Sequence, residues 1–152
     1  HSFSGVVEKT DTGPLPQITV LVDGPAQQIQ RRQNYRVKCL LPIEVFGALP
    51  EDAGTGASQP VFIKTVTSDI SAGGISFRNA QRIPVGTQLN VKLWLPDDGA
   101  VIEIPCSVIY SEFVSEHQTL YRTAIRYIAL TESERSRIVR FIYRTQLKVA
   151  RS

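Results

Sequence analysis

Three arginines, Arg31, Arg32 and Arg36, form the first group of side chains whose type and spacing suit chemistry. They lie in the segment Gln30–Arg36, which contains no acidic residue to neutralise them. A guanidinium can form paired hydrogen bonds with a phosphate or with the O6/N7 edge of guanine, and it stacks on base faces. The segment therefore indicates a site for a phosphodiester or a planar anion. On composition alone, a solvated basic linker is the alternative.

The second group lies in residues 69–74, which read Asp-Ile-Ser-Ala-Gly-Gly. Gly73 and Gly74 permit a positive φ and a close approach of the backbone to a ligand. Successive amides in such a turn can bind an anion, and the Ser71 hydroxyl adds a donor. Asp69 could accept hydrogen bonds from the N1/N2 edge of guanine or hold an arginine in place. The alternative is an ordinary turn in which Asp69 and Ser71 bond their own backbone.

Predicted β-strands border both groups and must position them. We expect one strand over 35–46, directly after the arginines, with Pro42 indicating an edge or a bulge. Residues 61–69 show the alternation of a strand that ends at Asp69. The next strand begins at Gly74, so the glycine-containing turn joins two strands. The two groups could therefore converge on one ligand.

The rest of the chain predicts a small antiparallel β barrel with one C-terminal helix. Turn-rich loops separate further strand-like segments, which are expected over 74–78, 87–95, 101–113 and 120–130. Residues 131–134 fit a capping box at the start of a helix. One apolar face follows at helical spacing, made of Ile138, Phe141, Ile142 and Thr145. The fold class expected is all-β with a C-terminal helix.

Two domains are predicted, an N-terminal β segment over 1–28 and a main domain over 29–152. The first contains two strand-like runs, at 6–7 and 18–22, with a loop of turn-forming residues between them. Two strands alone are marginally stable in water. We therefore expect them either to belong to an upstream companion domain or to pack on the main domain.

Composition narrows the possible classes of protein. The chain has 152 residues and is 42% hydrophobic, which suits a globular domain with a core. No apolar run approaches the ~20 residues of a membrane helix, and no secretion signal is visible in the given sequence. The use of cysteine suits a cytoplasmic location, which we expect. Cys39 and Cys106 lie in apolar runs and are expected to be reduced core thiols, with a disulfide or a metal site as the alternative.

The charge and the residue types favour a binding protein over an enzyme. The formal net charge is +3, and the arginines cluster near residue 31 and in the C-terminal helix, which indicates an anionic partner. His117 lies in a polar loop, where a solvated side chain is expected. No nucleophile with a general base and no metal-ligand spacing is visible, so we expect no catalysis, no metal and no cofactor.

Taken together, the two groups resemble the motifs of PilZ domains. Arg32-x-x-x-Arg36 matches the RxxxR motif of that family, and Asp69-x-Ser71-x-x-Gly74 matches its Asp/Asn-x-Ser-x-x-Gly motif. The resemblance implies a six-stranded antiparallel barrel whose surface binds the bacterial second messenger cyclic di-GMP. In such proteins the flexible arginine segment wraps around the dinucleotide, and the second motif contacts it from the barrel.

The resemblance extends over roughly residues 29–147 and implies the following ligand contacts: Arg32 and Arg36 from the first motif, and Asp69, Ser71 and Gly74 from the second. Gly73 would contribute through its backbone. A basic residue at Arg31 is similar to members that bind a stacked pair of cyclic di-GMP molecules, so one molecule or a stacked pair is expected. Strand residues Arg78, Arg122 and Arg126 could also reach the ligand, and the sequence does not choose among them.

The N-terminal strands are similar to the end of the companion barrel in flagellar-brake (YcgR-like) PilZ proteins. Ligand binding by the arginine linker would then fix the orientation of two domains, or act on a protein partner, and control motility, biofilm or exopolysaccharide output. Two alternatives remain: a PilZ-like interaction module that binds no nucleotide, and a basic barrel that binds RNA or single-stranded DNA. The second alternative requires surface aromatics between the basic residues, and most aromatics near the arginines occupy expected core positions.

Overall fold

The structure, a computed structural model, describes residues 5–11, 17–22, 34–50, 58–96, 99–115 and 119–150. The chain divides into two compact units, His1–Gln33 and Asn34–Ser152. In the first unit, β1 (Gly5–Asp11) pairs with β2 (Gln17–Val22) in an antiparallel ladder. Both N-terminal strands indicated by the sequence are therefore present.

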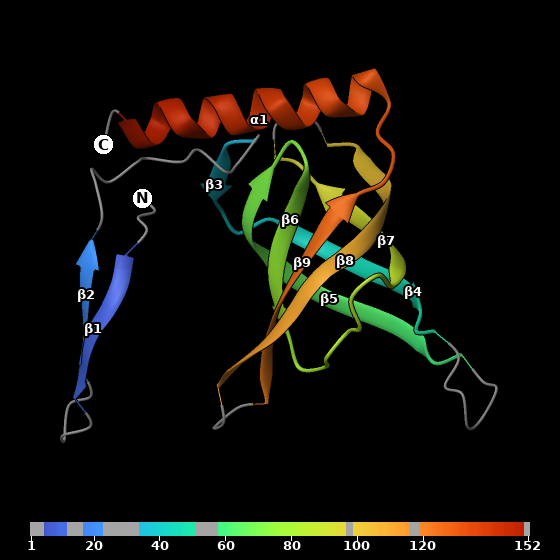
Figure 1. Cartoon of the computed structure of the whole chain (residues 1–152). Coiled ribbons are helices and arrows are strands. Elements are labelled where there is room, and N and C mark those ends of the chain that lie inside the picture. Colours follow the sequence, from blue (N-terminus) through green and yellow to red (C-terminus); the bar gives the residue numbers. More distant parts are fainter. Residues whose placement is uncertain are drawn as a thin grey trace. The chain divides into compact units, whose positions relative to one another are not determined.

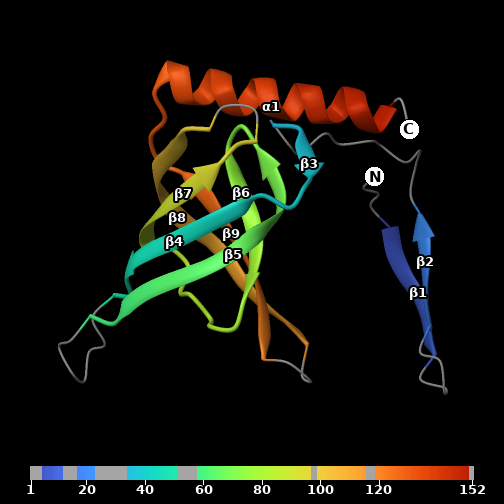
Figure 2. The same ribbon diagram turned by 180° about the vertical axis from the view of Figure 1, so that it is seen from behind.

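The second unit contains a closed antiparallel barrel (Figure 1, Figure 2). Six strands form it in the order β5, β4, β7, β8, β9 and β6, and β6 pairs back onto β5 to close the sheet. Their bounds are β4 (Pro42–Ala48), β5 (Pro60–Ser71), β6 (Gly74–Asn79), β7 (Gln88–Trp94), β8 (Val101–Ser115) and β9 (Leu120–Tyr127). A short seventh strand, β3 (Arg36–Lys38), pairs with the end of β5. The predicted fold class is confirmed.

Buried and more exposed side chains alternate along the strands, and the buried ones form the core of the barrel, as the sequence pattern indicates. Val91 and Leu93 on β7 and Ile104 on β8 are fully buried, while their neighbours along each strand are more exposed. Alternate side chains of a strand point to opposite faces, so one apolar set fills the inside of the barrel. The interior is packed with side chains, which places any ligand site of this unit on the outer surface or at an end.

The prediction of one continuous strand over 35–46 is wrong. The segment forms β3 and β4, which pair along the same edge of β5 and are separated by a break with a one-residue shift in register. The buried Thr67 of β5 fills this break: its hydroxyl donates to the Cys39 carbonyl (2.6 Å) and accepts from the Leu41 amide (3.0 Å). A side chain replaces ladder hydrogen bonds here, and Pro42 begins β4.

The C-terminal helix α1 (Glu132–Ala150) lies across one end of the barrel and contacts β3 and β5 (Figure 1). Its start is the expected capping box: the Glu134 amide donates to the Thr131 hydroxyl, and the Thr131 amide donates to the Glu134 carboxylate. The Thr131 amide and the Thr131 hydroxyl both donate to this carboxylate, and these two hydrogen bonds hold the pKa of Glu134 below its usual range. Ile138, Phe141 and Ile142 are buried in the core, so the helix closes this end of the barrel.

Both cysteines are free thiols. Cys106 is buried in β8 and donates to the Leu89 carbonyl, and burial raises its pKa to about 12. Burial also raises the pKa of the half-buried Cys39. Thiols with raised pKa values stay protonated near neutral pH and react slowly.

In the described ranges, no group of three or more His, Cys, Asp or Glu side chains could hold a metal ion. In the same ranges, no helix is long and apolar enough to cross a membrane.

Candidate ligand-binding site

Asp69 points out of the barrel because β5 contains a bulge. Thr67 pairs with Phe77 and Asp69 pairs with Ser76, so Ser68 is an extra residue in the ladder with β6. Regular alternation from Thr67 would direct Asp69 into the core. The bulge reverses the alternation, so Ile70 becomes fully buried and Asp69 remains partly accessible at the surface.

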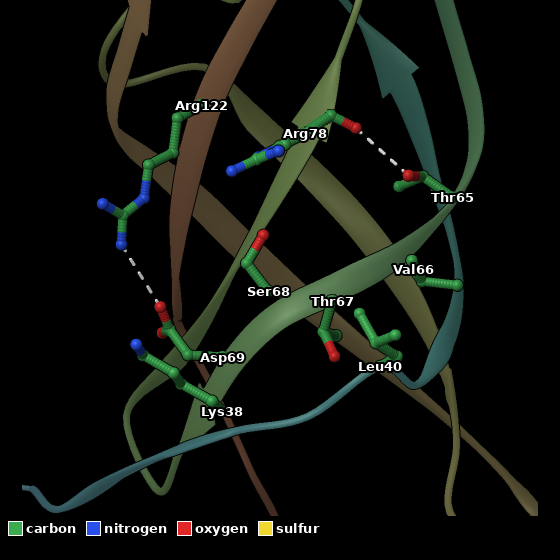
Figure 3. Close-up of a pocket in the computed structure, with 9 residues that line it drawn as sticks. All are labelled: Lys38, Leu40, Thr65, Val66, Thr67, Ser68, Asp69, Arg78 and Arg122. Atoms are coloured by element: carbon green, nitrogen blue, oxygen red, sulfur yellow. Dashed lines mark hydrogen bonds and ion pairs between the residues drawn. The ribbon is translucent and has the colours of Figure 1, made fainter. Parts of the chain in front are cut away.

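Two side chains hold the Asp69 carboxylate. The Ser76 hydroxyl donates to its Oδ2 at 2.6 Å. The Arg122 guanidinium lies 3.4 Å from the same oxygen, as Figure 3 shows by a dashed line. Among the described residues, no hydrogen bond reaches Oδ1. Asp69 therefore does not bond its own backbone, as the ordinary-turn alternative required, and it keeps acceptor capacity for a ligand with N–H groups.

Ser71 has the role that the ordinary-turn alternative assigned to it. The β5–β6 connection is a two-residue turn, with Ser71 and Gly74 as partners in the ladder. The Ser71 hydroxyl donates to the Gly74 carbonyl (3.1 Å) and accepts from the Gly73 amide (3.3 Å). Because Ser71 is buried and bonded within the turn, it fixes the shape of the turn.

Close packing is the reason for a glycine at position 74. A Cβ built there would lie 2.1 Å from the Ile125 carbonyl oxygen of β9. The Tyr127 amide donates to the Gly73 carbonyl (3.0 Å), which ties the turn to the end of β9. Neither Gly73 nor Gly74 has a positive φ. The close approach at Gly74 is to a strand of the barrel, and close approach of this turn to a ligand stays a prediction.

The β3–β5 ladder brings the end of the arginine segment to this turn. Arg36 is the register partner of Ser71, and Lys38 is the partner of Asp69. Arg36 is the first residue of β3, and it is exposed. The predicted ligands Arg31 and Arg32 lie outside the described residues. Of the first motif, the structure thus places Arg36 beside the second motif.

A cavity of about 550 Å³ opens beside Asp69 on the outer face of the barrel (Figure 3). Its volume lies within the roughly 300–1,000 Å³ usual for small-molecule sites. Three basic residues from three strands line it with Asp69: Lys38 of β3, Arg78 of β6 and Arg122 of β9. Arg78 and Arg122 were two of the three strand arginines that the sequence left undecided, and Arg126 is not among the lining residues.

Two residues of this site were not singled out from the sequence. Lys38 lines the cavity, and the Asn34 side chain lies over Gly73, where a Cβ would be 2.8 Å from its amide nitrogen. Asn34 follows the arginine pair, and Lys38 occupies the same face of β3 as Arg36. The period of two that runs from Arg36 could have indicated Lys38.

Comparison with known proteins identifies the family and the fold. The family model for the PilZ domain matches residues 30–144. No curated protein matches the chain. The inhibitor of motility (MotI/DgrA) of Bacillus subtilis superposes with a TM-score of 0.67 at 19% identity, over 96% of this chain and 66% of that chain.

Two structures of complexes with c-di-GMP are also similar. YcgR from Escherichia coli has a TM-score of 0.62 at 16% identity, over 95% of this chain and 59% of that chain. MrkH from K. pneumonia has a TM-score of 0.59 at 19% identity, over 98% of this chain and 66% of that chain. The present chain thus spans about two thirds or less of these proteins, and the likeness shows a shared fold. Because the family model matches most of the chain, this protein belongs to the PilZ domain family.

Proposed function

We propose that this chain is a receptor for cyclic di-GMP. The observation that carries the proposal is the β3–β5 ladder, which places Arg36 beside Ser71 and Lys38 beside Asp69 at the edge of a basic cavity. Membership of the PilZ family supports it, as do the c-di-GMP complexes of YcgR and MrkH. A cyclic dinucleotide offers both phosphodiesters for the arginines and guanine N–H groups for a carboxylate.

Each proposed ligand residue has a role that follows from its chemistry. Asp69 accepts from the N1/N2 edge of a guanine. Ser71 and Gly74 hold the turn that presents the Gly73 backbone. The arginines Arg31, Arg32 and Arg36 bind phosphates and guanine edges, since their forks match both. The ligand is one molecule or a stacked pair, with Arg31 favouring the pair.

The proposal extends to a switch of the flagellar-brake type. The arginine segment joins the unit His1–Gln33 to the unit Asn34–Ser152, and the first unit would be the end of a companion domain. A ligand that holds the segment would select one orientation of the two units or one partner surface, provided that it binds that arrangement more tightly. Control of motility, biofilm or exopolysaccharide output by a cytoplasmic protein is the corresponding cellular role.

Ligand-induced stabilisation provides a test of this proposal. A ligand that binds only the folded state adds about 2.7 kcal/mol to the free energy of unfolding at a concentration of about 100 Kd. We expect cyclic di-GMP to raise the unfolding midpoint of the wild type in a thermal melt and to leave that of Arg36→Ala unchanged. Arg140→Ala, which removes an exposed arginine of α1, is the matched control and should respond as the wild type does. An equal shift in Arg36→Ala would contradict the assignment.

A further inference from the structure

A pair of arginines faces the cavity from neighbouring strands. Arg78 of β6 and Arg122 of β9 are direct register partners in an antiparallel ladder. Both are exposed, and both line the cavity. In Figure 3 the Arg78 guanidinium is directed toward the side of the cavity where Arg122 lies. Like charges placed directly opposite each other in a ladder destabilise the sheet, so this pair carries a cost in the ligand-free protein.

The surrounding residues offset only part of this charge. Asp69 lies 3.4 Å from Arg122, a long contact, and its Oδ2 already accepts from Ser76 at 2.6 Å. In the part of the chain that the structure describes, Arg78 and Lys38 have no ion pair. Glu112 of β8 is the register partner of Arg122 on its other side, but it is not among the residues that line the cavity. Three cationic side chains and one carboxylate therefore line the cavity, which keeps an excess of positive charge.

We infer that the Arg78–Arg122 pair forms a phosphate-binding subsite of this cavity and takes a phosphodiester of the ligand. The inference rests on the proposed function and adds two residues that lie outside both motifs. A phosphate has the negative charge that relieves the repulsion between the two arginines, and its oxygens match the two forks. A neutral guanine edge would accept hydrogen bonds but would not relieve that repulsion.

The same subsite also explains how the second oxygen of Asp69 becomes more accessible. Oδ1 is unbonded among the described residues, and in the empty cavity Arg122 lies at Oδ2, the other oxygen that a two-point contact with a guanine edge uses. A phosphate between the two arginines attracts Arg122, and the long Arg122–Asp69 contact is exchanged for a shorter charged one. Ser76 retains its bond to Asp69 and keeps the carboxylate oriented. One ligand therefore occupies both positions, with its phosphate on the arginine pair and its base on Asp69.

The test compares Arg78→Gln and Arg122→Gln with Arg140→Gln, which removes the same charge from α1. Each variant loses charge-assisted hydrogen bonds to the phosphate, so we expect cyclic di-GMP to bind each cavity variant at least about tenfold more weakly in calorimetry. Ligand-free Arg78→Gln should unfold at a temperature equal to or above that of the wild type, because the like-charge pair is removed. Affinity of both variants within twofold of Arg140→Gln would overturn the inference and leave the proposed function intact.

Binding of inorganic pyrophosphate tests the phosphate subsite independently of cyclic di-GMP binding, which is the proposed function. We expect it to compete with cyclic di-GMP in the wild type and to shift the arginine Nε signals in NMR spectra, and both effects should be lost in Arg78→Gln. If the wild type binds pyrophosphate but not cyclic di-GMP, the proposed function fails and the phosphate subsite stands. Simultaneous binding of both compounds, or no response to pyrophosphate in the wild type, would overturn the subsite.

Discussion

Replacement of Asp69 by alanine is expected to weaken cyclic di-GMP binding by about 100-fold or more while the domain stays folded. The carboxylate accepts N–H groups of the guanine edge, and charge-assisted hydrogen bonds contribute about 1.5–3 kcal/mol each. The loss of two such bonds corresponds to roughly two to four powers of ten in Kd. Isothermal titration with the purified variant measures the effect.

The control must separate the loss of a ligand contact from a change in charge or fold. Glu103 is an exposed carboxylate of β8, and Glu103→Ala removes the same charge at a distance from the turn. We expect this variant to bind as the wild type does, and urea unfolding should show that Asp69→Ala remains folded. Unchanged affinity in folded Asp69→Ala would remove the second motif from the ligand site.

Substitution of Gly74 by alanine is expected to reduce the free energy of unfolding by roughly 2–4 kcal/mol and to abolish ligand binding. The new Cβ would overlap the Ile125 carbonyl oxygen, which is backbone and cannot rotate away. Overpacking costs about 1–3 kcal/mol, and separation of the turn from β9 also weakens the bond between the Tyr127 amide and the Gly73 carbonyl, worth about 1 kcal/mol. Urea denaturation, followed by circular dichroism, measures the stability.

Gly73→Ala is the matched control for this substitution. A Cβ at position 73 would meet the Asn34 side-chain amide, the end of a flexible side chain that can move. We therefore expect Gly73→Ala to lower the free energy of unfolding by no more than about 1 kcal/mol. Equal stabilities of the two variants would show that the turn does not pack against β9 as described.

Much of the barrel could be predicted from local sequence pattern. The alternation over residues 87–95 identified β7, and the capping box at Thr131 located the start of α1 within one residue. These features depend on neighbours in the sequence, so they are visible without knowledge of the fold. The PilZ motifs identified the β5–β6 turn in the same way.

The break between β3 and β4 could not be predicted, because its cause is distant in sequence. The apolar composition of 35–46 suits one strand, and the hydrogen bonds that interrupt it come from Thr67 of β5. The orientation of Asp69 has a similar origin. Continued alternation from Thr67 would place Asp69 inside the barrel, and the bulge at Ser68 depends on the pairing with β6.

The cavity could not be predicted without knowledge of the order of the strands in the barrel. Lys38, Arg78 and Arg122 belong to three strands that are far apart in the sequence, and the ladders β3–β5, β5–β6 and β6–β9 bring them together. Sequence spacing gave no reason to choose Arg78 and Arg122 over Arg126, which does not line the cavity. The choice follows from the register of β6 with β9.

Isothermal titration of the wild-type chain with cyclic di-GMP tests the central claim most directly, with GTP and a cyclic mononucleotide as controls. We predict saturable binding of cyclic di-GMP alone, and the stoichiometry of the transition will distinguish one molecule from a stacked pair. If folded protein shows no binding of cyclic di-GMP, or binds the control nucleotides equally well, the receptor function is contradicted, and an interaction module that binds no messenger becomes the better account of this fold.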